Sequence, residues 1–99
     1  MIKHVVMFRF RDDVDVATRR MVRETFRDQI LALRDRLSII RSIEVGFNVN
    51  EQELWDICLV GEFDTLDDVR AYSVFPDHMA AAGVLKPYLQ GRSCVDYVV

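Results

Sequence analysis

The stretch Ile2–Arg11, IKHVVMFRFR, opens the chain and decides its fold. In an extended strand alternate side chains point to opposite faces, so His4, Val6 and Phe8 share one face while Met7 lies on the other. Both faces are apolar at the centre, which predicts a strand that is buried on both sides. Helices can cover one of these faces, and a second layer of protein has to cover the other.

Two helical segments follow from the spacing of apolar residues and from capping residues. Over Val16–Leu37 apolar side chains recur every three or four positions behind Asp15, a suitable N-cap, so a first helix is expected there. A second helix is expected behind Thr65, which begins a capping box. Pro76 ends that helix and can open another, so residues 77–89 are expected to form a short helix and an irregular return.

Three further strands complete the pattern, and alternating apolar residues place them at about Ile39–Asn50, Trp55–Phe63 and Arg92–Val99. The resulting β-α-β-β-α-β string with right-handed crossovers predicts one α+β, ferredoxin-like domain over residues 1–99. Its antiparallel four-stranded sheet is expected in the order 4-1-3-2, with the helices on one face. Two such sheets packed through their open faces would close a β-barrel in a homodimer, which accounts for the apolar second face of the first strand.

The amino-acid composition and the net charge limit the partners and the location that are expected for this chain. The chain has 99 residues, of which 51% are hydrophobic, and a net charge of −3. So many apolar residues in a small domain indicate a surface that a second copy covers. The acidic balance disfavours nucleic-acid binding, and no apolar run suits a signal peptide or a membrane span, so a cytoplasmic protein is expected. Cys58 and Cys94 lack metal-ligand spacing and fall in strands that are not neighbours, so both are expected to be free thiols.

The segment Tyr72–His78 carries the first candidate for chemistry. It sets a phenol and an imidazole close together across the break between two helices, and His4 is the only other histidine. Imidazole titrates near pH 6.5 and a tyrosine can donate to a carbonyl oxygen, so these side chains suit an acid/base site. The structural alternatives are that His78 packs or caps at the helix break, that His4 is a buried group bonded to a backbone carbonyl or a tyrosine, and that Tyr72 is a core aromatic.

Three stretches taken together resemble the stress-response A/B barrel family (Dabb, dimeric α/β barrel). They are Ile2–Asp12, Ile43–Gly46 and Tyr72–His78, and the resemblance covers almost the whole chain. It implies a homodimer with an open cavity on the sheet side. The family usually has a histidine immediately before the proline of the third stretch, where this chain has Phe75.

The resemblance also implies roles for individual residues. The family includes polyketide cyclases, which close an aromatic ring on a linear polyketide. By resemblance, His78 and Tyr72 are the implied acid/base pair, and His4 lies in the cavity with them. Because many members of the family have no known activity, the resemblance does not fix a reaction.

Two functions from different classes are therefore open. The first is a cyclase- or isomerase-type enzyme for a small, apolar, carbonyl-bearing substrate; the second is a non-catalytic stress-response dimer or a module that binds a small apolar ligand. No phosphate loop, dinucleotide fingerprint, nucleophile elbow or metal motif is present in the sequence, so neither a cofactor nor a metal is expected. The replacement at Phe75 makes the expected pocket less polar and favours the second function. The expected cavity wall consists of Val6, Phe8, Phe47, Trp55 and Phe75.

Overall fold

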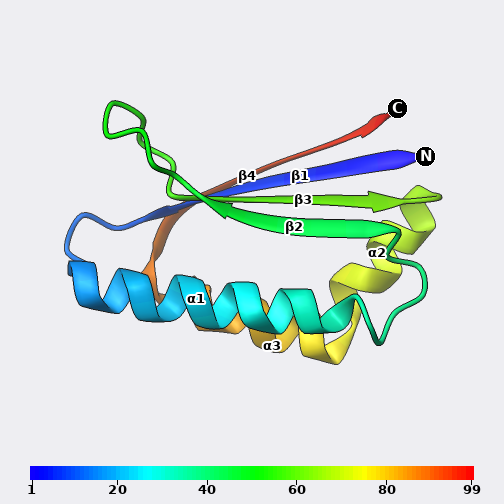
Figure 1. Ribbon diagram of the computed structural model, residues 1–99, viewed down its shortest axis with the longest axis horizontal. Helices are drawn as coiled ribbons and strands as arrows, with labels where there is room; N and C mark the ends of the chain where they lie inside the picture. Colours follow the sequence, from blue (N-terminus) through cyan, green and yellow to red (C-terminus); the bar gives the residue numbers. More distant parts are fainter.

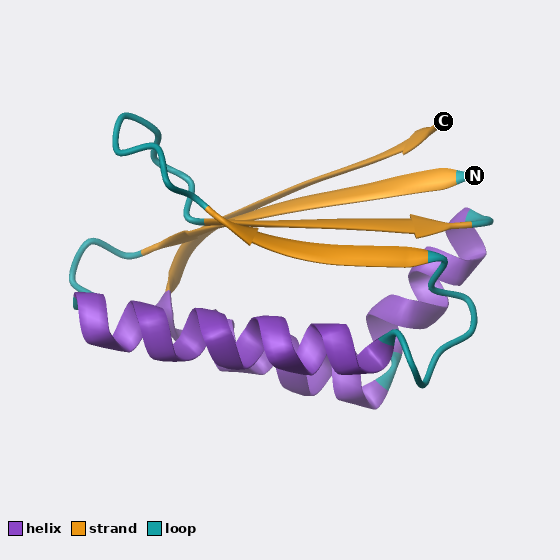
Figure 2. Ribbon diagram, viewed as in Figure 1, coloured by secondary structure: helices purple, strands orange, loops and turns teal.

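The computed structural model describes residues 1–99 and shows a four-stranded sheet with the helices against one of its faces (Figure 1). Figure 2 shows the same two layers, with the strands above the helices. The elements in chain order are β1 (Ile2–Phe10), α1 (Val16–Leu33), β2 (Ser42–Phe47), β3 (Ile57–Phe63), α2 (Leu66–Val74), α3 (Pro76–Leu85), the 3₁₀ turn η1 (Lys86–Tyr88) and β4 (Leu89–Val98).

All neighbouring strands of the sheet are antiparallel, in the order β2-β3-β1-β4. This is the predicted order 4-1-3-2 viewed from the other edge, so the ferredoxin-like prediction is confirmed. β1 is central because it pairs along its length with both β3 and β4. In this register His4 of β1 lies opposite Gly61 of β3 and opposite Asp96 of β4.

The first helix is shorter than the sequence pattern predicts. α1 ends at Leu33, four residues before the predicted end at Leu37. The backbone tightens there, because the amides of Arg34 and Arg36 each donate to the carbonyl three residues back. The apolar periodicity continues through this turn because Leu37 still packs against the core.

Strand ends also differ from the prediction. β2 covers Ser42–Phe47 rather than Ile39–Asn50. In the loop that follows, the Asn48 side-chain amide donates to the carbonyls of Asn50 and Glu53. β3 (Ile57–Phe63) begins two residues after its predicted start at Trp55. β4 begins at Leu89, three residues before its predicted start at Arg92. Cross-strand pairing therefore sets these ends, which the alternation of side chains alone does not reveal.

Both predicted helix caps are present. The Asp15 carboxylate accepts a hydrogen bond from the Thr18 amide at 2.7 Å, which holds the pKa of Asp15 below its usual value. The Thr65 hydroxyl accepts from the Asp68 amide at 3.1 Å at the start of α2. These caps satisfy backbone amides that have no partner within the helix.

A proline separates α2 from α3. Phe75 has φ −63° and ψ 132°, the extended conformation favoured before proline, and Pro76 takes the first position of α3. The predicted short helix is regular for ten residues, to Leu85. The break turns α3 back along α1, so residues on the two sides of Pro76 face one another.

The core lies between the sheet and the helices. Phe26 of α1 packs edge-on against Phe8 of β1, with 5.3 Å between ring centroids. Burial of one such side chain stabilises the fold by about 1.5–3 kcal/mol. None of the helices combines the length and apolar character needed to cross a membrane. The core cluster consists of Val6, Phe8, Phe10, Val22, Phe26, Ile30, Leu33, Ile40, Ile43, Ile57, Leu59, Phe63, Val69, Tyr72, Ala81 and Leu85.

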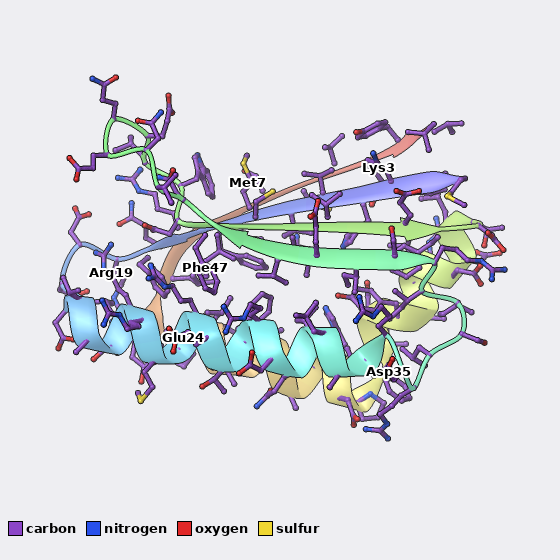
Figure 3. All side chains as sticks on the ribbon, viewed as in Figure 1. Lys3, Met7, Arg19, Glu24, Asp35 and Phe47 are labelled. Atoms are coloured by element: carbon purple, nitrogen blue, oxygen red, sulfur yellow. The ribbon has the colours of Figure 1, made fainter.

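The opposite face of the sheet is open in the protomer. Met7 points away from the helices, whereas Phe47 lies on the side of α1 (Figure 3). Met7, Val95 and Tyr97 share this open face and have exposed fractions of 36%, 53% and 44%. It is the surface for which the sequence predicts a second layer.

Candidate functional site

A cavity of about 360 Å³ lies between the inner face of the sheet and the helices. The resemblance implied an open cavity on the sheet side, whereas this cavity lies between the sheet and the helices, within the protomer. Its volume is in the lower part of the range for small-molecule sites, roughly 300–1,000 Å³. The twelve lining residues are His4, Val6, Phe8, Phe26, Leu59, Tyr72, Ser73, His78, Ala82, Lys86, Leu89 and Arg92.

The Tyr72 side chain projects from α2 into the floor of this cavity. It is fully buried, and its hydroxyl has no hydrogen-bond partner among the protein groups. The ring packs against Phe63 at 5.1 Å between centroids, which fixes its position. Burial raises the pKa of Tyr72, so the hydroxyl keeps its proton and is a free hydrogen-bond donor.

His78 lies next to Tyr72, from the first turns of α3, with 4.4 Å between the ring centroids. Its Nδ1 is 3.0 Å from the Ser73 carbonyl oxygen. Because a carbonyl only accepts, Nδ1 carries the proton in the neutral ring, and Nε2 is left with its lone pair. Burial lowers the pKa of His78, and the nearby His4 and Arg92 lower it further, while the Ser73 carbonyl opposes them in part; the net lowering favours the neutral, basic ring.

His4 reaches the same cavity from the centre of the sheet, where it is 5% exposed. Its Nδ1 is 2.5 Å from Oδ1 of Asp96, its cross-strand neighbour on β4. The ring packs edge-on against Tyr72 and Phe63, each at 6.1 Å between centroids. Gly61 lies opposite His4, and a Cβ there would come within 3.0 Å of the Phe63 ring, so this position needs glycine to leave that ring in place.

Two cations in the cavity were not identified from the sequence. Lys86 and Arg92 both line it, and neither forms an ion pair with an acidic side chain. The positive charge of Arg92 partly offsets the effect of burial on the pKa of Tyr72. The available sequence signal was alternation along β4, which places Arg92 on the same face as Asp96.

The structure brings some of the expected wall residues together and separates the others. Val6 and Phe8 line the cavity beside His4. Phe47 and Trp55 instead line a second hollow of about 380 Å³ near the β2–β3 loop, whose wall includes Met7 of the open face.

Phe75 lies outside both hollows. Its ring is half-buried against the core, under the guanidinium of Arg36 at 5.8 Å. The expectation that its replacement of a histidine makes the pocket less polar is wrong, because Phe75 does not reach the pocket.

Comparison with known proteins agrees with this architecture. A family model described as the stress responsive A/B barrel domain matches residues 2–99. A dimeric ferredoxin-like protein of unknown function from Bacteroides fragilis is 46% identical, with a TM-score of 0.97; the match covers 99% of this chain and 95% of that chain. No curated protein matches the sequence.

More distant structures share the fold. A dimeric ferredoxin-like protein of unknown function from Thermobifida fusca is 25% identical, with a TM-score of 0.82, over 99% of this chain and 90% of that chain. A hydroxynitrile lyase from Passiflora edulis is 11% identical, with a TM-score of 0.74, over 99% of this chain and 92% of that chain. At that identity the likeness shows the fold alone.

Proposed function

Because the chain belongs to the stress-responsive A/B barrel domain family, we propose that it is a homodimer in which each cavity is an acid/base site for a carbonyl compound. The observation that carries the proposal is the buried, unpartnered hydroxyl of Tyr72 beside the neutral imidazole of His78. A buried donor without a protein partner is costly, and a ligand oxygen would satisfy it. Proton abstraction next to a carbonyl needs both a base and such a donor.

The chemistry assigns one role to each group. The Tyr72 hydroxyl donates a hydrogen bond to the substrate carbonyl oxygen, and Nε2 of His78 takes a proton from the adjacent carbon. The C–H electron pair moves into the carbonyl to give an enolate, whose negative charge Tyr72 and the nearby Arg92 stabilise. The protonated His78 then returns its proton, either to carbon, which gives an isomerase, or to a second carbonyl that the enolate carbon attacks, which gives a cyclase.

The protein environment suits this sequence of steps. Seven of the twelve lining residues are hydrophobic, so charges inside the cavity interact more strongly than they do in water. The Ser73 carbonyl holds the His78 tautomer that leaves Nε2 free for the proton. A positioned general base of this kind contributes about 10²–10⁴-fold to a rate.

The proposed homodimer accounts for the open face of the sheet. The Bacteroides fragilis and Thermobifida fusca proteins are described as dimeric with ferredoxin-like folds. In this chain Met7, Val95 and Tyr97 supply an apolar surface on the side away from the helices. A second copy packed there through the same face would remove this surface from water.

The alternative function, binding of a small apolar carbonyl compound without turnover, uses the same Tyr72 donor in the same apolar wall. One experiment separates the two. Aromatic ketones and linear triketones are incubated with the dimer in D₂O, and NMR follows deuterium entry next to the carbonyl and the histidine resonances.

Deuterium exchange next to the carbonyl supports the enzyme function if His78→Gln abolishes it. Tyr88→Phe, outside the cavity, is the control and should leave the exchange unaffected. Ligand-induced shifts of the His78 resonances without exchange support the binding module. Neither exchange nor any shift over the whole panel contradicts the proposed site. Circular dichroism shows whether each variant keeps its fold.

A further inference from the structure

Three potential metal ligands lie close together on the inner face of the sheet, and none of them belongs to the proposed acid/base pair of Tyr72 and His78. His4 of β1 and Cys94 and Asp96 of β4 place one donor atom each within 4.8 Å of one another. The Cys94 Sγ is 3.6 Å from Nδ1 of His4 and 4.0 Å from Oδ2 of Asp96, and that Nδ1 is 2.5 Å from Oδ1 of Asp96. β4 supplies two ligands two residues apart on one face, and the paired strand supplies the third.

One of these three distances already suits a tetrahedral metal, and the other two need a small movement of the Asp96 carboxylate. With zinc bonds of about 2.0–2.1 Å to nitrogen, 2.3 Å to sulfur and 2.0–2.2 Å to oxygen, ligand atoms lie roughly 3.3–3.7 Å apart. The sulfur–nitrogen distance of 3.6 Å already has that value. The carboxylate has to withdraw from His4 Nδ1 by about 1 Å and approach Cys94 Sγ by a few tenths of an ångström. The Asp96 side chain, which makes this movement, is 29% exposed.

The donor set selects the class of ion. A thiolate and an imidazole favour zinc(II) over magnesium or calcium, which prefer oxygen ligands. Thiolate and carboxylate together supply two negative charges to balance a divalent ion. On binding, the Cys94 thiol releases its proton to solvent, and the His4 proton moves from Nδ1 to Nε2 as the metal takes its place.

The packing around His4 prepares the site. The ring is held by its edge contacts with Phe63 and Tyr72, so little rotational freedom is lost on binding. Cys94 and Asp96 are exposed, which leaves a path for the ion to enter. The Arg92 charge acts on the same thiol and opposes a bound cation.

We propose that His4, Cys94 and Asp96 bind one zinc(II)-class ion per protomer, with a fourth coordination position left for water or a ligand. The proposal goes beyond the acid/base function and does not rest on it, because neither Tyr72 nor His78 is a ligand. The sequence did not reveal it, because the ligands lie about ninety residues apart and only the pairing of β1 with β4 brings them together.

The first test is a cobalt(II) titration of the full-length protein. One cobalt per protomer is expected, with a thiolate-to-cobalt charge-transfer band in the near ultraviolet, and zinc should displace it. Cys94→Ser should remove the band and Asp96→Asn should weaken affinity at least about tenfold, whereas Cys58→Ser, on the opposite face, should change neither. Arg92→Gln should tighten binding by removing the opposing charge.

A second measurement needs no variant and so stands even where Cys94→Ser does not fold. The wild-type protein is treated with iodoacetamide with and without zinc, and the two cysteines are followed by mass spectrometry. Zinc should slow alkylation of Cys94 and leave Cys58 unchanged. Equal protection of both cysteines, no protection of either, or a cobalt band that Cys58→Ser removes as well would each overturn the proposal.

Discussion

Replacing Tyr72 with phenylalanine should make the protein more stable and less able to use its site. The hydroxyl is buried, without a protein partner, while the ring packs against Phe63 and His78. Tyr72→Phe keeps the ring and removes only the oxygen. A buried polar group left unsatisfied costs about 1–3 kcal/mol.

The lower end of that range applies at this position. The hydroxyl borders a cavity of about 360 Å³, wide enough to admit water, which offsets part of the cost. Tyr72→Phe should therefore raise the free energy of unfolding by about 1 kcal/mol. In a domain of this size that raises the melting temperature by about 4–8 °C.

The assay is urea unfolding followed by circular dichroism at one fixed protomer concentration, because the stability of a dimer depends on concentration. Tyr88→Phe is the matched control, since Tyr88 is half-buried and outside the cavity, and it should stay within about 0.5 kcal/mol of the parent. A loss of more than 1 kcal/mol in Tyr72→Phe would show that the hydroxyl has a partner in the folded protein. The argument that it waits for a substrate oxygen would then be wrong.

Three further predictions concern the base, the open face and a helix cap. Burial lowers the pKa of His78 below 6.5, so below that pH the unfolded chain binds more protons than the folded one and the free energy of unfolding decreases. His78→Gln should weaken this pH dependence of the free energy of unfolding between pH 7 and 5. An unchanged pH dependence would contradict the lowered pKa. Val95→Glu should convert the dimer to monomer or aggregate in sedimentation, whereas Val49→Glu, at a fully exposed loop position, should not; a Val95→Glu dimer of unchanged affinity would exclude this interface. Thr65→Ala should lower the free energy of unfolding, measured by chemical denaturation, by about 1 kcal/mol because the Asp68 amide loses its acceptor. Thr65→Ser should restore the stability; if both variants were equally stable, the Thr65 hydroxyl would not be a stabilising cap.

Much of the site was predictable because it is local. Tyr72 and His78 are six residues apart, and a proline between two helices folds the chain back over that distance. The alternation along β1 likewise placed His4, Val6 and Phe8 on one face, and all three line the cavity. Each inference needed only neighbouring residues and the period of one element.

The rest of the site depends on pairing between distant strands. Asp96 is 92 residues from His4, and a shift of one residue in the β1–β4 register would turn it to the other face. Trp55 and Phe47 looked like cavity residues from their size, but the Asn48 turn and the late start of β3 place them at another hollow. Phe75 was expected in the pocket, but its ring packs against the core beside Arg36 instead.

The sequence by itself determined the order of elements, the ferredoxin-like sheet, the helix caps and the closeness of a phenol to an imidazole. These features follow from side-chain period, capping and proline geometry, which act over a few residues. Only the tertiary structure decided that the cavity lies on the helix side, that the Tyr72 hydroxyl has no protein partner, and that Asp96 and Cys94 meet His4. Burial and strand register decide these, and both depend on how distant segments pack together.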